Sequence, residues 1–306
     1  MAIIKKDAYF HSDNGINMIH TSIWQNDEIT PVGIVQIAHG MGDHVGRYEA
    51  LAHFLTDCGY IVCGNDHIGH GKSVESVEEL GKCPPDGYVT MLRDMNTLYR
   101  IMHKRYPELP YFMLGHSMGS LLVRVYASKF AADLKGIIIC GTVHFPWQMM
   151  AFDNTVKTVL NILPQNGSNV DIFGKVTKLM LGEDDDLSWL AKSPSVIESY
   201  RADPLCNAPA DTGMKTSLFD LALRACNPST IEALPYNLPV LIISGAKDPL
   251  GMFGKSIIDF ADTLTKNGLD PDVYLYPGLR HAILCEDDND RVFDDILSFL
   301  NRALAK

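Results

Sequence analysis

A serine near the middle of the chain lies in a pattern suited to nucleophilic chemistry. Residues 115–119 are Gly-His-Ser-Met-Gly; they follow the apolar run 111–114 and precede the helix-like stretch 120–130. Between a strand and a helix, this G-x-S-x-G pattern forms a turn so tight that small residues are needed on both sides, and the serine hydroxyl is exposed at the helix N-terminus. We therefore predict Ser117 as a nucleophile. The alternative is a serine that caps the helix of an ordinary strand–helix unit.

A serine nucleophile needs a general base and an acid that orients the base. In this kind of site both residues follow the serine in the chain, each just beyond a later strand. The β-branched run 238–247 ends in a small-residue turn and Asp248, and the alternating strand 272–276 leads through a Pro-Gly turn to His281. We expect His281 to take the Ser117 proton and return it to the leaving group, while Asp248 fixes the imidazole tautomer.

Each of these two partners also has a structural alternative. Asp248 would serve equally as the cap of a helix that begins near Gly251, and His281 as a solvated loop histidine. Asp270 and Asp272 compete with Asp248 for the role of the acid, but they precede the last strand instead of following one. The order serine, aspartate, histidine, each after its own apolar strand, favours the catalytic interpretation.

Acyl transfer also requires N–H donors for the oxyanion. The amide of Met118, directly after the nucleophile, is the first candidate. The second should come from the loop 39–44, His-Gly-Met-Gly-Asp-His, because it follows a buried-looking strand at 34–38 and its glycines let the backbone approach a substrate closely. We choose the amide of Met41. Since only its backbone acts, replacing the Met41 side chain should be milder than replacing Ser117.

At these positions the chain resembles a known family, the monoacylglycerol lipase and lysophospholipase-like branch of the α/β-hydrolases, also labelled the serine aminopeptidase S33 or hydrolase-4 group. The motifs that carry the resemblance are residues 39–44 and 46–48, the Asp-His-Ile-Gly-His-Gly-Lys-Ser run at 66–73, residues 115–119, Asp248, His281, and the segments 188–190 and 200–205. The resemblance extends from about residue 9 to 304. It implies an α/β-hydrolase fold, with a mainly parallel eight-stranded sheet flanked by helices and an inserted helical cap.

The elements that must position these residues are visible in the hydrophobic pattern. A hairpin is expected at 7–24, around the Asn-Gly turn signal at 14–15. Further apolar strands are expected near 32–38, 60–64, 111–114, 136–140, 238–244 and 272–276, and helices near 47–58, 87–106, 118–130, 253–267 and 290–304. This alternation is typical of a mainly parallel sheet covered on both faces.

One interval does not fit that alternation. Residues 142–237 are too many for a single crossover, so we predict a helical cap at 146–232 inserted into a hydrolase core formed by 1–145 and 233–306. The cap begins with an apolar stretch rich in methionine and aromatic residues at 143–163. Such side chains suit an acyl pocket, although ordinary packing of the cap on the core explains them equally well.

The composition of the chain excludes some classes of binding partner and indicates the cellular compartment. The chain has 306 residues, of which 46% are hydrophobic, enough for one main domain with an elaboration. Its net charge of −11 argues against nucleic acid as a partner and against polybasic docking on anionic lipid. The N-terminus lacks a signal-peptide pattern, no apolar run is long enough to be a membrane segment, and the seven cysteines suit a reducing compartment. We expect a cytoplasmic protein.

A group of histidines and an aspartate invites a metal interpretation. The residues concerned are His39, His44, Asp66, His67 and His70. However, the oxyanion loop accounts for the first of them, and the segment from Asp66 resembles the family's structural loop after its strand. Metal binding would also require the side chains to converge. We predict no metal and no cofactor.

The expected function is hydrolysis of a carboxylic ester through an acyl-enzyme on Ser117. The resemblance implies monoacylglycerol or lysophospholipid as the substrate class. A general short-chain carboxylesterase and a serine aminopeptidase use the same chemistry and stay open as alternatives. A non-catalytic binding protein of the same fold is an alternative of another class, although no member of the triad is visibly lost. Dehalogenases and epoxide hydrolases would carry aspartate where Ser117 stands.

Overall fold

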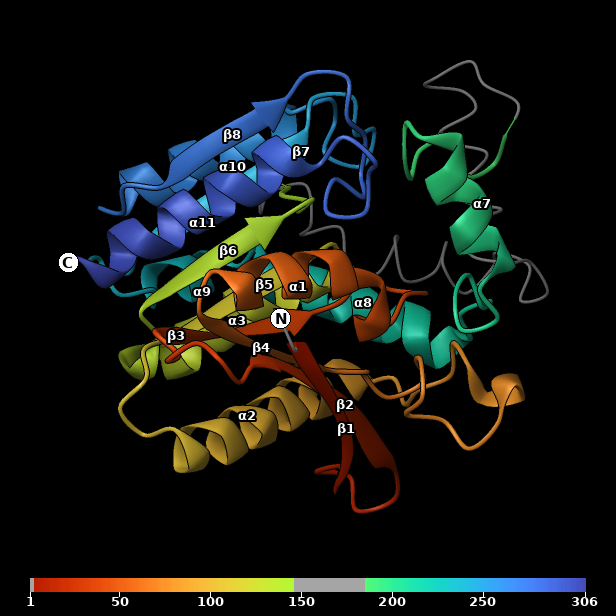
Figure 1. Ribbon diagram of the computed structural model, residues 1–306. Coiled ribbons are helices and arrows are strands. Elements are labelled where there is room, and N and C mark those ends of the chain that lie inside the picture. Colours follow the sequence, from red (N-terminus) through yellow and green to blue (C-terminus); the bar gives the residue numbers. More distant parts are fainter. Residues whose placement is uncertain (1–2, 146–184) are drawn as a thin grey trace.

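The computed structural model describes residues 3–145 and 185–306. Its eight strands form one sheet in the order β1-β2-β4-β3-β5-β6-β7-β8 (Figure 1). The strands are β1 Ile3–His11, β2 Met18–Asn26, β3 Gly33–Ala38, β4 Tyr60–Asn65, β5 Tyr111–His116, β6 Gly136–Cys140, β7 Val240–Gly245 and β8 Asp272–Tyr276. β1 pairs antiparallel with β2, and β2 pairs antiparallel with β4. The remaining strands, β4, β3, β5, β6, β7 and β8 in sheet order, pair in parallel. The predicted mainly parallel eight-stranded sheet is confirmed.

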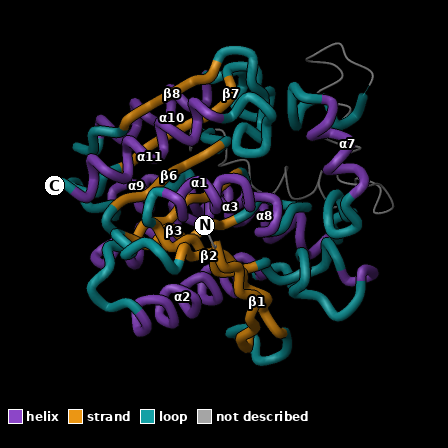
Figure 2. Tube along the Cα trace, viewed as in Figure 1, coloured by secondary structure: helices purple, strands orange, loops and turns teal. Residues whose placement is uncertain are grey.

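Helices connect and cover these strands (Figure 2). The α-helices are α1 Glu49–Asp57, α2 Gly87–Arg105, α3 Met118–Phe130, α7 Pro194–Ala202, α8 Thr212–Ala225, α9 Pro228–Glu232, α10 Lys255–Lys266 and α11 Asp290–Leu304, with 3₁₀ turns at Val45–Tyr48, Val77–Glu79 and Ala131–Asp133. The five helices expected from the hydrophobic pattern are confirmed to within two residues at each end.

The sheet separates two hydrophobic cores. One core lies between the sheet and helices α1 and α11, and the other lies between the sheet and helices α2, α3, α8 and α10. Phe112 and Leu114 of β5 pack into the first core, and their neighbours Tyr111 and Met113 pack into the second. Because successive side chains of a strand point to opposite faces, a strand covered on both sides must be apolar throughout. The central strands are therefore continuous hydrophobic runs.

Two strand boundaries differ from the expected ones for simple reasons. β7 begins at Val240 instead of 238, because Pro239 has no N–H for the ladder and contributes only its carbonyl, which accepts from the Ile137 N–H. The N-terminal hairpin extends from residue 3 to 26 instead of 7 to 24, and six residues separate the end of β1 at His11 from the start of β2 at Met18. Its turn is therefore a wider loop than the two-residue Asn-Gly turn that the sequence suggested.

The predicted cap at 146–232 is described only in its second half. Residues 146–184, which include most of the apolar stretch at 143–163, lie outside the described residues. Helices α7, α8 and α9 belong to the remainder, and α8 packs against α2 and α3 of the core. Figure 1 shows α7 on the side of the molecule toward which the arrowheads of β6 and β8 point. The boundaries of the cap stay a prediction.

None of the helices in the described part of the chain combines the length and the hydropathy that crossing a bilayer would require.

The hairpin loop is attached to the body of the protein through a buried carboxylate on α2. Asp94 is fully buried and accepts hydrogen bonds from the Ser12 hydroxyl at 2.9 Å and from the Asp13 N–H at 2.8 Å. Burial raises the pKa of Asp94 to about 6, and these two hydrogen bonds oppose the rise without cancelling it. The folded protein therefore binds a proton at Asp94 at a pH where the unfolded chain does not.

We predict that Asp94 makes the protein more stable as the pH falls. Its pKa is about 6 in the folded state against the ordinary 3.8, so the gain begins as the pH falls through 6 and is complete below 3.8. The free energy of unfolding of the wild type, relative to Asp94→Asn, should rise by about 1 kcal/mol between about pH 7.5 and about pH 5. Urea unfolding of both proteins measures this difference. An equal pH dependence in the two proteins would contradict the prediction.

Candidate active site

The turn that carries Ser117 is as tight as its sequence suggested. A Cβ atom at Gly115 would lie 2.2 Å from the carbonyl oxygen of Gly119, and a Cβ at Gly119 would lie 2.0 Å from the carbonyl oxygen of Ala38. Neither position has room for a side chain. Between these two glycines Ser117 adopts φ 54° and ψ −118°, an unfavourable conformation for a residue with a Cβ. Backbone strain of this kind costs about 1–3 kcal/mol and is typical of functional sites.

Backbone hydrogen bonds hold Ser117 in this conformation. Its N–H donates to the carbonyl oxygen of Cys140 on β6 at 3.0 Å, and its own carbonyl accepts from the Ser120 hydroxyl at 2.5 Å. The Ser117 side chain makes no capping hydrogen bond to α3. The alternative role as a helix cap therefore finds no support in this geometry.

Asp248 and His281 meet at the carboxyl ends of β7 and β8. The Nδ1 atom of His281 lies 2.8 Å from Oδ2 of Asp248, and the two side chains are 2% and 0% exposed. The other carboxylate oxygen, Oδ1, accepts from the Leu250 N–H at 2.9 Å. A buried carboxylate fixed in this way holds the imidazole with its Nδ1 protonated and its Nε2 available as a base.

The positions of these residues bear on the structural alternatives that the sequence left open. Helix α10 begins at Lys255 after Gly254, so Asp248 does not cap it. Asp272 pairs with Arg302 of α11 at 2.6 Å near the surface, and Asp270 is exposed. His281 is buried and not a solvated loop residue.

Two aromatic rings enclose His281. The ring centroid of His116 lies 4.9 Å away, and that of Trp189 lies 5.3 Å away. Burial, reinforced by the neighbouring His281, lowers the pKa of His116 to about 4. A neutral His116 places no positive charge beside the imidazolium that His281 would form. Its Nδ1 lies 3.0 Å from the Tyr48 hydroxyl, and its Nε2 lies 3.1 Å from the carbonyl oxygen of His281.

The loop 39–44 passes close to Ser117. A Cβ at Gly40 would lie 3.2 Å from the Cβ of Ser117, so a glycine permits the close approach. Met41 is half-buried and Met118 is buried, and both residues line the same cavity as Ser117. The backbone amides of Met41 and Met118 stay the predicted donors to an oxyanion.

Helix α7 and the segment that follows it hold the next residue of this loop, Gly42. The carbonyl oxygen of Gly42 accepts from the Tyr200 hydroxyl and from the Asn207 N–H, each at 2.9 Å. The guanidinium of Arg47 lies over the Tyr200 ring at 4.7 Å, and Asp203 pairs with His44 at 2.9 Å. The conformation of the loop beside Ser117 therefore depends on residues more than 150 positions later in the chain.

The histidines considered as metal ligands do not form one cluster. The rings of His39, His67 and His70 pack together, with centroids 4.3 to 6.5 Å apart. Burial, with the neighbouring His39, lowers the pKa of His70 to about 4. His44 faces Asp203 instead, and these two residues with Cys206 are the set among the described residues whose potential ligand atoms lie within 4.8 Å of one another.

The aspartate of that group is a structural anchor. Burial alone would raise the pKa of Asp66, but the hydrogen bond with His20 Nδ1 and backbone N–H donors lower it to about 2. Those N–H groups belong to Val45 and Lys72, each at 2.8 Å from a carboxylate oxygen. Asp66 thus ties the loop after β4 to the end of the loop 39–44.

A cavity of about 380 Å³ opens beside Ser117. Its walls are mainly apolar, and Leu121, Val143, Phe145, Leu218, Phe219 and Leu250 are among the residues that form them. Tyr200, Asn207 and Lys215 are among the residues with polar side-chain groups that also line it. We did not identify Trp189 or these three as site residues from the sequence. The only signal was that Trp189 and Tyr200 lie in segments resembling the family's cap.

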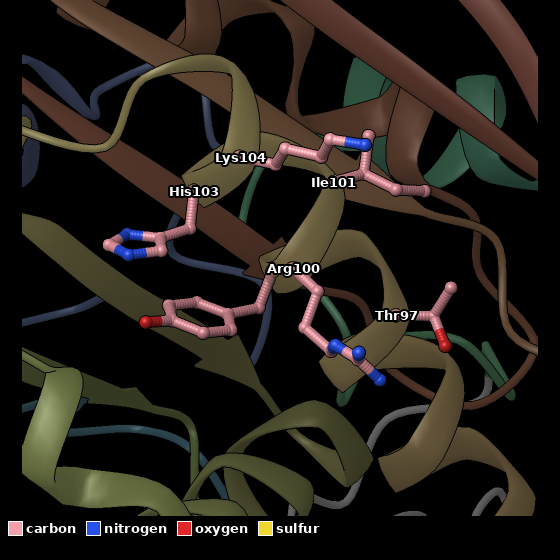
Figure 3. A pocket seen from close by; sticks show the side chains of 6 residues that line it. Thr97, Arg100, Ile101, His103 and Lys104 are labelled. Atoms are coloured by element: carbon pink, nitrogen blue, oxygen red, sulfur yellow. The ribbon is translucent and has the colours of Figure 1, made fainter.

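A second hollow lies on the outer face of α2 (Figure 3). It has a volume of about 450 Å³, and the residues that form it all come from one stretch of that helix, 97–104. It contains none of the residues predicted to carry chemistry, so we assign it no part in the reaction.

We predict that Tyr200 acts on turnover through the loop 39–44. Tyr200→Phe removes one of the two hydrogen bonds to Gly42 and keeps the ring that packs on Arg47. One such bond is worth about 1 kcal/mol, so kcat on an activated ester should fall roughly fivefold, with a smaller change in KM. Tyr236→Phe, at a ring that is 80% exposed, is the control. An unchanged kcat in Tyr200→Phe would contradict the prediction.

Comparison with known proteins identifies the family to which this chain belongs. The family model described as serine aminopeptidase, S33 (Hydrolase_4) matches residues 29–288. The chain is 27% identical over 299 residues to the monoacylglycerol lipase of Mycolicibacterium smegmatis, with 97% of each chain covered. It is 30% identical over 225 residues to the monoglyceride lipase of Homo sapiens, which covers 72% of this chain and 67% of the relative.

A solved structure agrees with these relatives. The carboxyl esterase from Bacillus coagulans, in complex with glycerol, has a TM-score of 0.86 and 28% identity to this chain, and the match covers 99% of this chain and 100% of the esterase. The chain therefore belongs to the serine aminopeptidase S33 (Hydrolase_4) family, has the α/β-hydrolase fold, and is a serine hydrolase of the group that includes monoacylglycerol lipases and esterases.

Proposed function

We propose that this protein hydrolyses carboxylic esters with an extended acyl chain, most readily a monoacylglycerol or a lysophospholipid, through an acyl-enzyme on Ser117. The observation that carries the proposal is a combination at one place. A strained serine lines an apolar cavity, and a buried Asp248–His281 hydrogen bond of 2.8 Å lies beyond the ends of β7 and β8, in ring contact with Trp189 of the same cavity.

In the proposed reaction, the Ser117 Oγ attacks the acyl carbonyl carbon and His281 Nε2 accepts its proton. The amides of Met41 and Met118 donate to the oxyanion that forms. The bond from carbon to the alcohol oxygen then breaks, and His281 returns the proton to the departing alcohol. Water attacks the acyl-enzyme by the same route, which releases the carboxylic acid and restores the Ser117 hydroxyl.

The residues that line the cavity favour a substrate with an apolar acyl group. Side chains such as Leu121, Leu218 and Phe219 offer hydrophobic surface and few hydrogen bonds, which suits a hydrocarbon chain better than a sugar. Relatives named as monoacylglycerol and monoglyceride lipases support the same substrate class. A short-chain ester would leave part of this surface unused.

The same lining argues against an aminopeptidase. The ammonium group of a peptide N-terminus needs a carboxylate counter-charge, and no aspartate or glutamate is among the described residues that line the cavity. The charged group found there is the cation Lys215. A non-catalytic binding protein is also disfavoured, because strain at Ser117 would then bring no benefit.

We predict that Ser117→Ala abolishes hydrolysis without loss of folding. Turnover should fall by at least about 10⁴-fold, since no other group replaces the nucleophile, and Asp248→Asn should cost roughly 10³- to 10⁴-fold through the wrong histidine tautomer. A fluorophosphonate probe should label the wild type on Ser117. Ser128→Ala, on the same helix α3 with its hydroxyl bonded to the Val125 carbonyl, is the control.

The substrates for this test are monoacylglycerols of several chain lengths, a lysophosphatidylcholine, short p-nitrophenyl esters and aminoacyl anilides. Ser117-dependent turnover that favours the longer acyl chains is the expected result. Turnover confined to short esters or to anilides would overturn the substrate proposal, and the absence of a Ser117 adduct in folded protein would overturn the enzymatic one.

A further inference from the structure

One face of helix α8 forms a wall of the cavity with a polar end and an apolar end. The residues of α8 that line the cavity are Lys215, Leu218, Phe219 and Ala222. Their spacing of three and four places them on one face of the helix, in successive turns. Because an α-helix rises 1.5 Å per residue, Lys215 lies about 10 Å along the helix from Ala222. A substrate beside α8 therefore meets a cation at one end and hydrocarbon along the rest.

The cation at this end has no partner among the residues that the structure describes. Lys215 is half-buried, and its ammonium makes no ion pair or hydrogen bond with any residue in the ranges 3–145 and 185–306. This is unexpected in a chain with a net charge of −11, where carboxylates outnumber lysine and arginine by 37 to 26. Most of the described lysines that line no cavity lie exposed on the surface, and several pair with acids there, as Lys192 does with Asp288.

The position of Lys215 is also unfavourable for the helix. Helix α8 begins at Thr212, so the ammonium lies near the end where the macrodipole is positive and where acidic side chains are preferred. Neither the helix dipole nor an ion pair with a described residue therefore stabilises the ammonium of Lys215. A ligand that carries negative charge would supply the counter-charge that is missing among the described residues.

A second polar group lies at the same cavity. Asn207 also lines it, and the backbone N–H of Asn207 is used by Gly42, whereas its side-chain amide has no hydrogen-bond partner within the described part of the chain. The Asn207 φ of 56° suits asparagine, which explains the residue type in part. A few polar groups in an otherwise apolar pocket are the usual means of fixing a ligand's orientation.

We propose that Lys215, assisted by the Asn207 amide, selects ester substrates that carry an anionic oxygen group, either a phosphate on the alcohol part or a carboxylate at the far end of the acyl part. This inference deepens the proposed function and rests on it for the ester. The mainly apolar lining of the cavity offers few other hydrogen-bond partners, and a charge-assisted hydrogen bond from an ammonium to phosphate or carboxylate is stronger than one between neutral groups. Lys215 is thus a specificity-determining residue and takes no part in the chemical step.

The test compares substrates that differ only in the charged group. The first pair is 1-lauroylglycerol and 1-lauroylglycerol 3-phosphate, and the second is p-nitrophenyl octanoate and mono-p-nitrophenyl suberate. For each pair the quantity measured is the ratio of kcat/KM for the anionic substrate to kcat/KM for the neutral one. The proteins are the wild type, Lys215→Met, Lys215→Arg and Lys104→Met.

In Lys215→Met this ratio should fall roughly 10- to 100-fold, the range of a hydrogen bond to a charged group. Lys215→Arg should restore most of it, since the charge returns, and added salt should lower the ratio in the wild type. Lys104→Met makes the same change of net charge in the hollow on α2 and should leave the ratio unchanged (Figure 3). A fall with the first pair identifies the anion as a phosphate on the alcohol, and a fall with the second identifies it as a carboxylate on the acyl chain.

Equal ratios in wild type and Lys215→Met for both pairs would overturn the proposal. Failure of the esterase proposal is distinguishable, because it appears as missing Ser117-dependent turnover of every ester. In that case binding still tests Lys215. The affinities of Ser117→Ala for dodecyl phosphate and for the uncharged 1-dodecylglycerol ether are compared with those of the double variant Ser117→Ala, Lys215→Met. A phosphate preference that disappears in the double variant supports the proposal, and equal preferences contradict it.

Discussion

The whole site depends on the absence of two side chains. Helix α3 begins directly against the ends of β3 and β5, and the backbone of Gly119 lies so close to the Ala38 carbonyl that a methyl group would have no space. That proximity forces the turn into which Ser117 is built, with its positive φ. The strain is offset by the burial of α3, which is buried without interruption from Met118 to Ala127. A well-packed helix therefore maintains an unfavourable serine conformation that an isolated turn would not keep.

Several histidines around this turn are uncharged. Three histidines near the site, His39, His70 and His116, have pKa values lowered by burial and stay neutral. The charged carboxylate that contacts His281 is Asp248. An imidazolium formed on His281 would therefore meet the negative charge of Asp248 and the uncharged rings of His116 and Trp189, and the carboxylate stabilises it. A neutral His116 packs against His281 without opposing the proton transfer.

The strands and helices of the fold could be predicted from the sequence, whereas the contacts around the cavity could not. Strands such as β6 and helices such as α3 follow from hydrophobic period and from glycine, because both signals are local. The hydrogen bond from Tyr200 to Gly42 joins residues 158 positions apart, and the contact of Trp189 with His281 joins two loops. No local pattern specifies such pairs, since they arise only when the chain is folded. For the same reason His44 could not be separated from His39 and His70 before the structure showed it facing Asp203.

The periodic face of α8 also bears on how relatives of this chain can diverge. Lys215, Leu218 and Ala222 line the cavity, whereas other residues of α8, such as Met214 and Leu221, are buried in the core and fix the rotation of the helix. A substitution at one of the cavity positions therefore changes the lining without disturbing the packing that holds α8 in place. Such a change would present a different set of side chains while Ser117, Asp248 and His281 stayed where they are. New preferences could arise in this fold without any alteration of the residues proposed to break bonds.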